Sequence, residues 1–137
     1  MREIIASEDE LAEVVSYLNS IVGEDAIIFL IGNLASGKTT LTAKIAQARG
    51  IEEEVTSPTF SLQQCYSKSL YHYDLYRIEN IEFMELGLFE EFDKSGWHLL
   101  EWGDEWLHAF LLNAGYNLFT VTIIPHEDRR KYSIEKN

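Results

Sequence analysis

The feature that most constrains the fold is a glycine-rich segment, Gly32–Thr39, which reads GNLASGKT and directly follows an apolar run. The spacing G-x-x-x-x-G-K-T is typical of a phosphate-binding loop when a strand precedes it and a helix follows. Ala26–Ile31 has the length and apolar character of a buried strand, and Thr40–Gly50 has a helical composition. The sequence therefore predicts a strand–loop–helix unit that binds a nucleoside triphosphate.

Each fixed position of this loop has a chemical reason. Gly32 and Gly37 lack a Cβ, so they are expected to allow positive φ and close approach of the backbone to a phosphate. Successive loop amides and the N-terminus of the helix would then point at anionic oxygens. Lys38 is predicted to reach the β- and γ-phosphates, and the Thr39 hydroxyl to bind Mg²⁺. Thr40 is expected to cap or pack at the start of the helix.

Composition predicts a single globular domain over residues 1–137 and argues against a membrane-spanning or secreted protein. Apolar residues make up 46% of the chain and charged residues 25%, which is an ordinary globular balance. The longest apolar run, Ala26–Ile31, is too short to cross a bilayer, and no secretory signal is visible. Cys65 cannot form an internal disulfide, because it is the only cysteine. A cytoplasmic location is therefore expected, with no membrane partner.

The formal net charge of −12 bears on the choice of partner. It opposes direct binding to the backbone of DNA or RNA, which favours a basic face. The acidic residues gather at Glu8–Glu10, at Glu52–Glu54 and from Glu79 to Asp93. These clusters are either solvated helix faces or a docking surface for a basic protein. The cationic run Arg129–Lys131 is expected to face solvent.

Patterning predicts the other helices and strands, and with them a mixed sheet. Ser7 is expected to cap the first helix, with Glu10 completing a capping box. The expected helices are Glu8–Val22, Ile81–Asp93 with a break near Gly87, and Glu105–Leu112. The expected strands are Arg2–Ile5, a hairpin of Phe60–Tyr66 and Leu70–Tyr76, then Trp97–Glu101, Leu118–Ile124 and Tyr132–Ile134. The predicted fold is an α/β, P-loop NTPase-like three-layer arrangement whose mixed sheet contains an antiparallel hairpin.

A triphosphate site also needs carboxylates for the metal and a segment that senses the nucleotide. Asp74 lies in an apolar-aromatic strand, where a charge is costly without a cation or metal, although an ion pair with Arg77 would also explain it. Glu101 ends a strand, where α/β sheets place groups that face a ligand, although it could instead cap the following turn. The hydroxyl-rich segment Thr56–Thr59 follows the loop helix, as a nucleotide-sensing segment would.

Five segments in order carry a family resemblance: GNLASGKTT at Gly32–Thr40, SPTF at Ser57–Phe60, HYDLYR at His72–Arg77, ELGL at Glu85–Leu88 and EW at Glu101–Trp102. Together they resemble the bacterial TsaE family, formerly YjeE, the small ATPases of tRNA threonylcarbamoyladenosine biosynthesis. The resemblance runs over most of the chain and implies a P-loop fold with antiparallel strands inserted in the sheet. It also implies binding of Mg²⁺ and ATP and slow hydrolysis to ADP.

The same resemblance implies a protein partner and a set of roles. The chain would dock on the TsaB–TsaD pair and reset that complex between rounds of threonylcarbamoyl transfer, meeting tRNA only through it. Lys38, Asp74 and Glu101 would be catalytic, and the magnesium site would use Thr39, Asp74 and Glu101. The residues implied to hold the nucleotide are Ser7, Asn33, Leu34, Ala35, Ser36, Gly37, Lys38, Thr39, Thr40, Ser57, Thr59, Trp102 and Arg129.

The loop departs from the family pattern at two positions. The family usually reads G-[DE]-L-G-A-G-K-T-T, whereas this chain has Asn33 in place of the acid and Ala35 in place of a glycine. Asn33 removes a negative charge beside the phosphates, and Ala35 is costly only if that position needs positive φ. Two other functions use the same loop. One is a small-molecule kinase, and the other is a nucleotide-gated binding module with vestigial hydrolysis.

Overall fold

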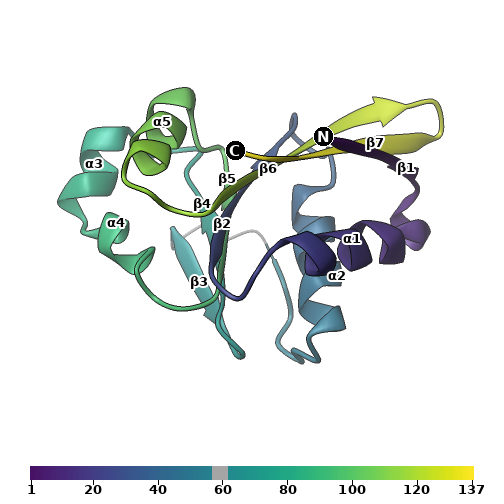
Figure 1. Ribbon diagram of the computed structural model, residues 1–137, viewed down its shortest axis with the longest axis horizontal. Coiled ribbons are helices and arrows are strands. Elements are labelled where there is room, and N and C mark those ends of the chain that lie inside the picture. Colours follow the sequence, from purple (N-terminus) through teal and green to yellow (C-terminus); the bar gives the residue numbers. More distant parts are fainter. Residues whose placement is uncertain (57–61) are drawn as a thin grey trace.

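The computed structural model describes residues 1–56 and 62–137, which form one seven-stranded sheet with helices on both faces (Figure 1). The strands are β1 (Arg2–Ala6), β2 (Ala26–Ile31), β3 (Gln63–Tyr66), β4 (Leu70–Asp74), β5 (Trp97–Glu101), β6 (Leu118–His126) and β7 (Arg129–Lys136). The helices are the 3-10 turn η1 (Glu8–Glu10), α1 (Ala12–Ile21), α2 (Lys38–Ala48), α3 (Asn80–Glu85), α4 (Leu88–Glu91) and α5 (Glu105–Asn113). Within the described residues, no helix combines the length and the apolar character needed to span a membrane.

The sheet is mixed, as predicted. Its strand order is β1-β7-β6-β2-β5-β4-β3. The central strand β2 runs parallel to β5 and β6, and β4 runs parallel to β5. Both margins are antiparallel, because β3 pairs with β4 and β7 pairs with β6 and β1. The predicted hairpin is confirmed where it is described, and a second hairpin, β6–β7, lies on the other side of β2, with β1 as the edge strand beyond it.

Several boundaries differ from the sequence-based expectations for local reasons. The expected first helix is divided into η1 and α1, and α2 begins at Lys38 rather than at Thr40. Gly87, at φ 74°, separates α3 from α4, which confirms the expected break. Strand β7 is longer than expected and contains the whole cationic run. Those cations do not simply face solvent, since they pair across to acidic residues: Arg129 with Glu10, Arg130 with Glu8 and Lys131 with Glu3.

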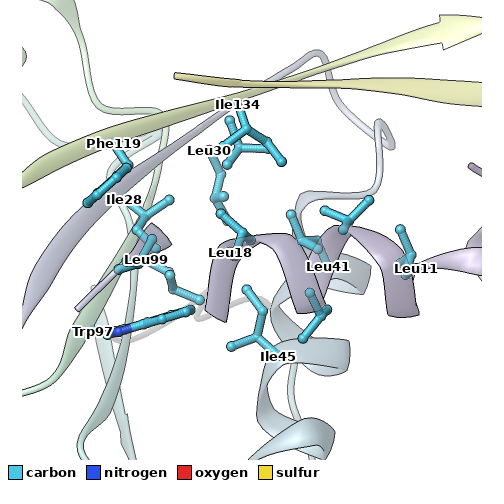
Figure 2. Packing of buried hydrophobic residues seen from close by; sticks show 14 of the residues in the cluster. Leu11, Leu18, Ile28, Leu30, Leu41, Ile45, Trp97, Leu99, Phe119 and Ile134 are labelled. Carbon is cyan, nitrogen blue, oxygen red and sulfur yellow. The ribbon is translucent and has the colours of Figure 1, made fainter. Parts of the chain in front are cut away.

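The two faces of the sheet bury different cores. Helices α1 and α2 cover one face over an aliphatic cluster, in which Leu18 and Ile45 pack toward Ile28 and Leu99 of the sheet (Figure 2). Helices α3, α4 and α5 cover the other face over a cluster that includes Tyr73, Phe83 and Phe92. The predicted three-layer α/β fold is therefore confirmed.

The parallel strands end together and bring their last residues to one edge of the sheet. In the register of β4 and β5, Asp74 lies opposite Glu101. In the register of β2 and β5, Leu30 lies opposite Glu101, so the chain enters the phosphate loop beside that carboxylate. The carboxyl edge of a parallel sheet is where α/β proteins bind ligands. The fold thus gathers the loop and both predicted acids at one place.

Candidate functional site

The phosphate loop lies between β2 and α2, as the motif predicts. Gly37 is the N-cap of α2 and adopts φ 102°, so its predicted left-handed conformation is confirmed. No side chain caps this end of the helix, and the first backbone amides of any helix lack intrahelical acceptors. Those amides and the positive end of the helix dipole are suited to an anionic ligand.

The two motif glycines are needed for different reasons. A Cβ on Gly37 would collide with the guanidinium of Arg130, in addition to the strain of its positive φ. Gly32 does not have a positive φ, so that part of the expectation is wrong. A Cβ on Gly32 would instead collide with the side chain of Ser36 and come within 3.0 Å of the Ile123 carbonyl oxygen. Gly32 therefore provides space for the loop to close on itself.

Ala35 occupies a position that favours glycine. Its φ is 60°, in the left-handed region that costs an L-residue about 1–2 kcal/mol. Because position 35 does adopt positive φ, the replacement of the family's glycine by Ala35 is costly here. The loop carries a local backbone strain at the point where the family pattern has glycine.

A cavity of about 790 Å³ opens over the loop and the carboxyl edge of the sheet. Its walls come from the loop, from the ends of β4 and β5, and from η1 and β7. The lining residues are Glu8, Leu34, Ala35, Ser36, Gly37, Lys38, Thr39, Thr40, Leu62, Asp74, Tyr76, Arg77, Glu101, Trp102 and Arg130. Seven successive loop and helix residues, both predicted acids and Trp102 are therefore brought together.

Lys38 lines this cavity, with its side chain folded over the loop. Its ammonium donates to the Gly32 carbonyl at 2.5 Å and lies 3.8 Å from the centroid of the Trp102 ring. Burial lowers the pKa of Lys38, while the nearby carboxylates of Glu101 and Asp74 oppose that shift. The side chain is thus a desolvated cation held among groups that a phosphate could replace.

Glu101 links the sheet edge to the loop. The Thr39 hydroxyl donates to Glu101 Oε2 at 3.1 Å, and His72 Nε2 lies 2.5 Å from the same oxygen. Glu101 is buried although its side chain is polar. It does not cap the following turn, because Asp104 caps α5 by accepting from the Leu107 amide at 2.8 Å. The alternative explanation for this acid is therefore wrong.

Asp74 lies beside Glu101 at the end of the neighbouring strand and lines the same cavity. Its Oδ1 accepts the backbone amide of Tyr76 at 3.0 Å, which orients the carboxylate at the strand end. The Tyr76 ring packs against Trp102, with ring centroids 4.9 Å apart. Trp102 itself adopts φ 64° and turns its ring over Lys38. These contacts form an aromatic wall beside the loop.

The placement of the remaining predicted residues is mixed. Ser7 does not line the cavity, and its backbone amide donates to Glu10 Oε1 at 3.0 Å, as a capping box requires. Arg129 points to Glu10, whereas its neighbour Arg130 reaches the loop. Ser57 and Thr59 of the predicted sensing segment Thr56–Thr59 lie outside the described residues, which leave out 57–61.

Sequence reasoning missed His72 and Arg130, although strand alternation could have found both. In β4, His72 is two residues before Asp74 and so shares its face of the sheet. In β7, Arg130 precedes Tyr132 by two residues, and Tyr132 is buried under α1 and α2. The same alternation places Arg129 on the opposite face. The available signal was a polar or charged residue placed, by strand alternation, on the same face as the buried residues of its strand.

The sheet topology, the loop and the carboxyl-edge acids define a protein of the P-loop NTPase-like class. The crystal structure of Bacillus subtilis YdiB is similar to this chain, with a TM-score of 0.66 over 97% of this chain and 84% of that one. The two are only 22% identical, so this likeness bears on the fold alone.

Comparison of sequences identifies the family. A family model described as "Threonylcarbamoyl adenosine biosynthesis protein TsaE" matches residues 5–132. The chain is 36% identical to the TsaE protein of Treponema pallidum over 107 residues, 76% of this chain and 79% of that protein. It is 43% identical to the TsaE protein of Bacillus subtilis over 79 residues, 56% of this chain and 49% of that protein. The chain therefore belongs to the TsaE family of tRNA threonylcarbamoyladenosine biosynthesis.

Proposed function

We propose that this chain is a Mg²⁺-dependent ATPase of tRNA threonylcarbamoyladenosine biosynthesis whose turnover is coupled to the TsaB–TsaD complex. The observation that carries the proposal is the 3.1 Å hydrogen bond from Thr39 to Glu101, which joins the phosphate loop to the acidic edge of the sheet. ATP hydrolysis would reset the complex between rounds of threonylcarbamoyl transfer. The chain would meet tRNA only through that complex, and its cytoplasmic location stays a prediction.

The oxygen groups at the cavity suit magnesium. Thr39 offers a hydroxyl, and Asp74 and Glu101 offer carboxylates, which are the hard oxygen ligands that Mg²⁺ prefers. Within the described residues, no group of three or more His, Cys, Asp or Glu side chains could hold a metal alone. Protein sites of Mg²⁺ commonly use one or two carboxylates together with phosphate oxygens and water. Held there by Thr39, Asp74 and Glu101, the ion would offset the charge that develops on the phosphate oxygens of ATP.

The protein groups would bind the triphosphate locally, against a net charge of −12. The loop amides and the N-terminus of α2 would hold the phosphate oxygens. The Lys38 ammonium would exchange the Gly32 carbonyl, its acceptor at 2.5 Å, for phosphate oxygens. Arg130 packs against Gly37 and is half-buried, so it would supply a second cation at the loop. These groups position the phosphates and stabilise their charge, which is most of what phosphoryl transfer requires of a protein.

The direct test is phosphate release from Mg-ATP by the purified chain, alone and with the TsaB–TsaD pair. Lys38→Ala serves as the blank, and Lys44→Ala on the same helix is the matched control. We expect slow release that rises with the partners, vanishes in Lys38→Ala and persists in Lys44→Ala. Tight partner binding without release would favour the nucleotide-gated binding module. A phosphorylated product in place of free phosphate would favour the small-molecule kinase.

A further inference from the structure

His72 is a buried histidine that contacts the site through the carboxylate of Glu101. It is completely buried in the middle of β4 and lies on the face of the sheet that carries Asp74. Its Nε2 is 2.5 Å from Glu101 Oε2, and both side chains are almost fully shielded from solvent. A histidine nitrogen and a carboxylate oxygen at this distance form a short hydrogen bond.

Both hydrogen bonds to the Glu101 carboxylate converge on one oxygen. Oε2 accepts the Thr39 hydroxyl at 3.1 Å and is also the oxygen that faces His72. Among the described residues, no hydrogen bond is made to Oε1. The carboxylate is thus fixed through one oxygen, and its second oxygen is left for another ligand.

The surroundings of the second ring nitrogen of His72 indicate whether His72 or Glu101 donates the hydrogen bond between them. Nδ1 is buried and has no hydrogen-bond partner among the described residues. A proton on Nδ1 would leave a buried donor unsatisfied, at a cost of about 1–3 kcal/mol. The ring therefore carries its proton on Nε2 and donates it to Glu101, because only that tautomer leaves no orphaned N–H group.

A histidine that serves only the core is expected to satisfy both nitrogens, and His98 provides the example. The Tyr73 hydroxyl donates to His98 Nδ1 at 2.7 Å, and His98 Nε2 donates to the Lys94 carbonyl at 2.8 Å. Among the described residues, the His72 side chain has one hydrogen-bond partner, which is the carboxylate that lines the cavity. Carboxylates that bind metal ions are themselves oriented by hydrogen bonds from neighbouring groups, and His72 is placed to supply such a bond to Glu101.

We propose that His72 is a positioning residue that holds Glu101 for magnesium. By donating Nε2–H to Oε2, it fixes the carboxylate against Thr39 and leaves Oε1 without a protein donor, available to the ion or its bound water. This inference rests on the proposed Mg²⁺–nucleotide function, and it assigns His72 no contact with the nucleotide. His72 should therefore govern the response to magnesium and leave the affinity for metal-free nucleotide unchanged.

The test is the binding of a fluorescent ADP, measured in EDTA and then across a Mg²⁺ titration. His72→Phe keeps a ring of similar size and removes the donor, whereas His72→Gln can place an amide N–H near the position of Nε2. We expect His72→Phe to need about tenfold more Mg²⁺ for the tightening of nucleotide binding, as the loss of such an orienting partner does elsewhere. Its affinity in EDTA should match that of the wild type, and His72→Gln should recover most of the response.

Two results would overturn the inference while leaving the proposed function intact. One is a wild-type magnesium response in His72→Phe. The other is an equal loss of nucleotide binding with and without Mg²⁺, which would mark a structural role. If the wild type itself shows no magnesium-dependent tightening, the proposed function fails, and the inference fails with it. Imidazole ¹⁵N–¹H NMR of the unsubstituted protein adds a check that needs no variant, because a proton on His72 Nδ1 would contradict the assignment.

Discussion

The two faces of the sheet differ in how completely their buried polar groups are hydrogen-bonded. On the face covered by α3, α4 and α5, the buried His98 and Tyr73 are bonded to each other and to further partners, Lys94 and Gln63. The face covered by α1 and α2 is mostly aliphatic, but its polar groups are incompletely paired. The four buried side-chain atoms without a hydrogen-bond partner among the described residues are Ser36 Oγ, His72 Nδ1, Arg130 Nη1 and Tyr132 OH.

All four of these atoms belong to the phosphate loop or to strand residues on the α1–α2 side. Arg130 Nη1 lies 3.2 Å from Glu8 Oε1, an ion pair too poorly aligned to count as a hydrogen bond. Buried polar groups that are left unsatisfied are costly, so a native fold retains them where another role requires them. The comparison shows that, among the described residues, the buried side-chain atoms left without a hydrogen-bond partner all lie on the side of the sheet that carries the site.

The sharpest way to break this comparison is to remove a carboxylate from the site face. Glu101→Ala or Asp74→Ala should lower partner-stimulated ATP hydrolysis by about 100-fold or more, since each removes a charged group that acts on the transferring phosphoryl group. Glu105→Ala, an exposed acid on α5, is the matched control and should hydrolyse ATP like the wild type. Intact hydrolysis in Glu101→Ala and Asp74→Ala would show that their metal roles are wrongly assigned.

A substitution on the opposite face of the sheet, Phe92→Ala, should destabilise the aromatic core without altering the site. Phe92 is buried among Tyr73, Phe83 and His98, with ring centroids between 5.2 and 5.7 Å from its own. Phe92→Ala should lower the free energy of unfolding by about 3–5 kcal/mol, because it leaves a cavity in a packed core. Denaturant unfolding measures that loss, and the affinity of the folded protein for nucleotide should not change. A selective loss of nucleotide binding in Phe92→Ala would contradict the division between the faces.

The pH dependence of stability sharpens the comparison at His98. Burial lowers the pKa of His98 from its ordinary value of 6.5, so the folded protein holds this ring neutral. As the pH falls through about 6.5, the unfolded chain takes up the proton first, and stability is lost until the folded ring protonates at its lower pKa. Urea unfolding from about pH 7.5 to about pH 5 should therefore show a shallower decline for His98→Gln than for the wild type. Parallel declines would mean that His98 contributes nothing to the acid sensitivity.

The smallest expected effect tests the strained loop backbone. Ala35→Gly removes a left-handed strain of about 1–2 kcal/mol but adds about 0.4–1 kcal/mol of unfolded-state entropy, so it should stabilise the fold by up to about 1.6 kcal/mol. Ala43→Gly, within α2, should instead destabilise it by about 1 kcal/mol, because glycine is a poor helix residue. Thermal unfolding of both variants measures the two signs. Destabilisation in Ala35→Gly would mean that the strain at this position is negligible.

Much of the fold could be predicted because its signals are local. The apolar run before the glycine-rich loop fixed β2, and the turn residues Ser67 to Ser69 fixed the β3–β4 hairpin. Strand β7 was predicted too short, because Arg129–Lys131 obscured the alternation of its buried residues Tyr132 and Ile134. A run of charged residues in a strand is interpreted as a solvent-exposed segment unless its ion-pair partners are known.

The site was predictable where a motif or strand end marked it and not where the contact was long-range. Lys38, Thr39 and Glu101 follow from the motif and the strand end. The pairing of His72 with Glu101 joins residues 29 positions apart, and no local pattern specifies it. The choice between Arg129 and Arg130 likewise depends on which face of β7 turns toward Gly37, and that is fixed only when β7 pairs with β6.

The most direct test of the central claim is NMR mapping of the protein with Mg²⁺ and a non-hydrolysable ATP analogue. The three tryptophans report on three places: Trp102 beside Lys38, Trp97 with its indole bonded to the Gly23 carbonyl at 2.7 Å, and the exposed Trp106 on α5. We predict the largest shifts in the amides of Asn33–Thr40 and in the Trp102 indole, with Trp97 and Trp106 unchanged. Shifts centred on Trp97 or Trp106, or no shifts at the loop, would contradict the assignment of the nucleotide site to the phosphate loop at the carboxyl edge of the sheet.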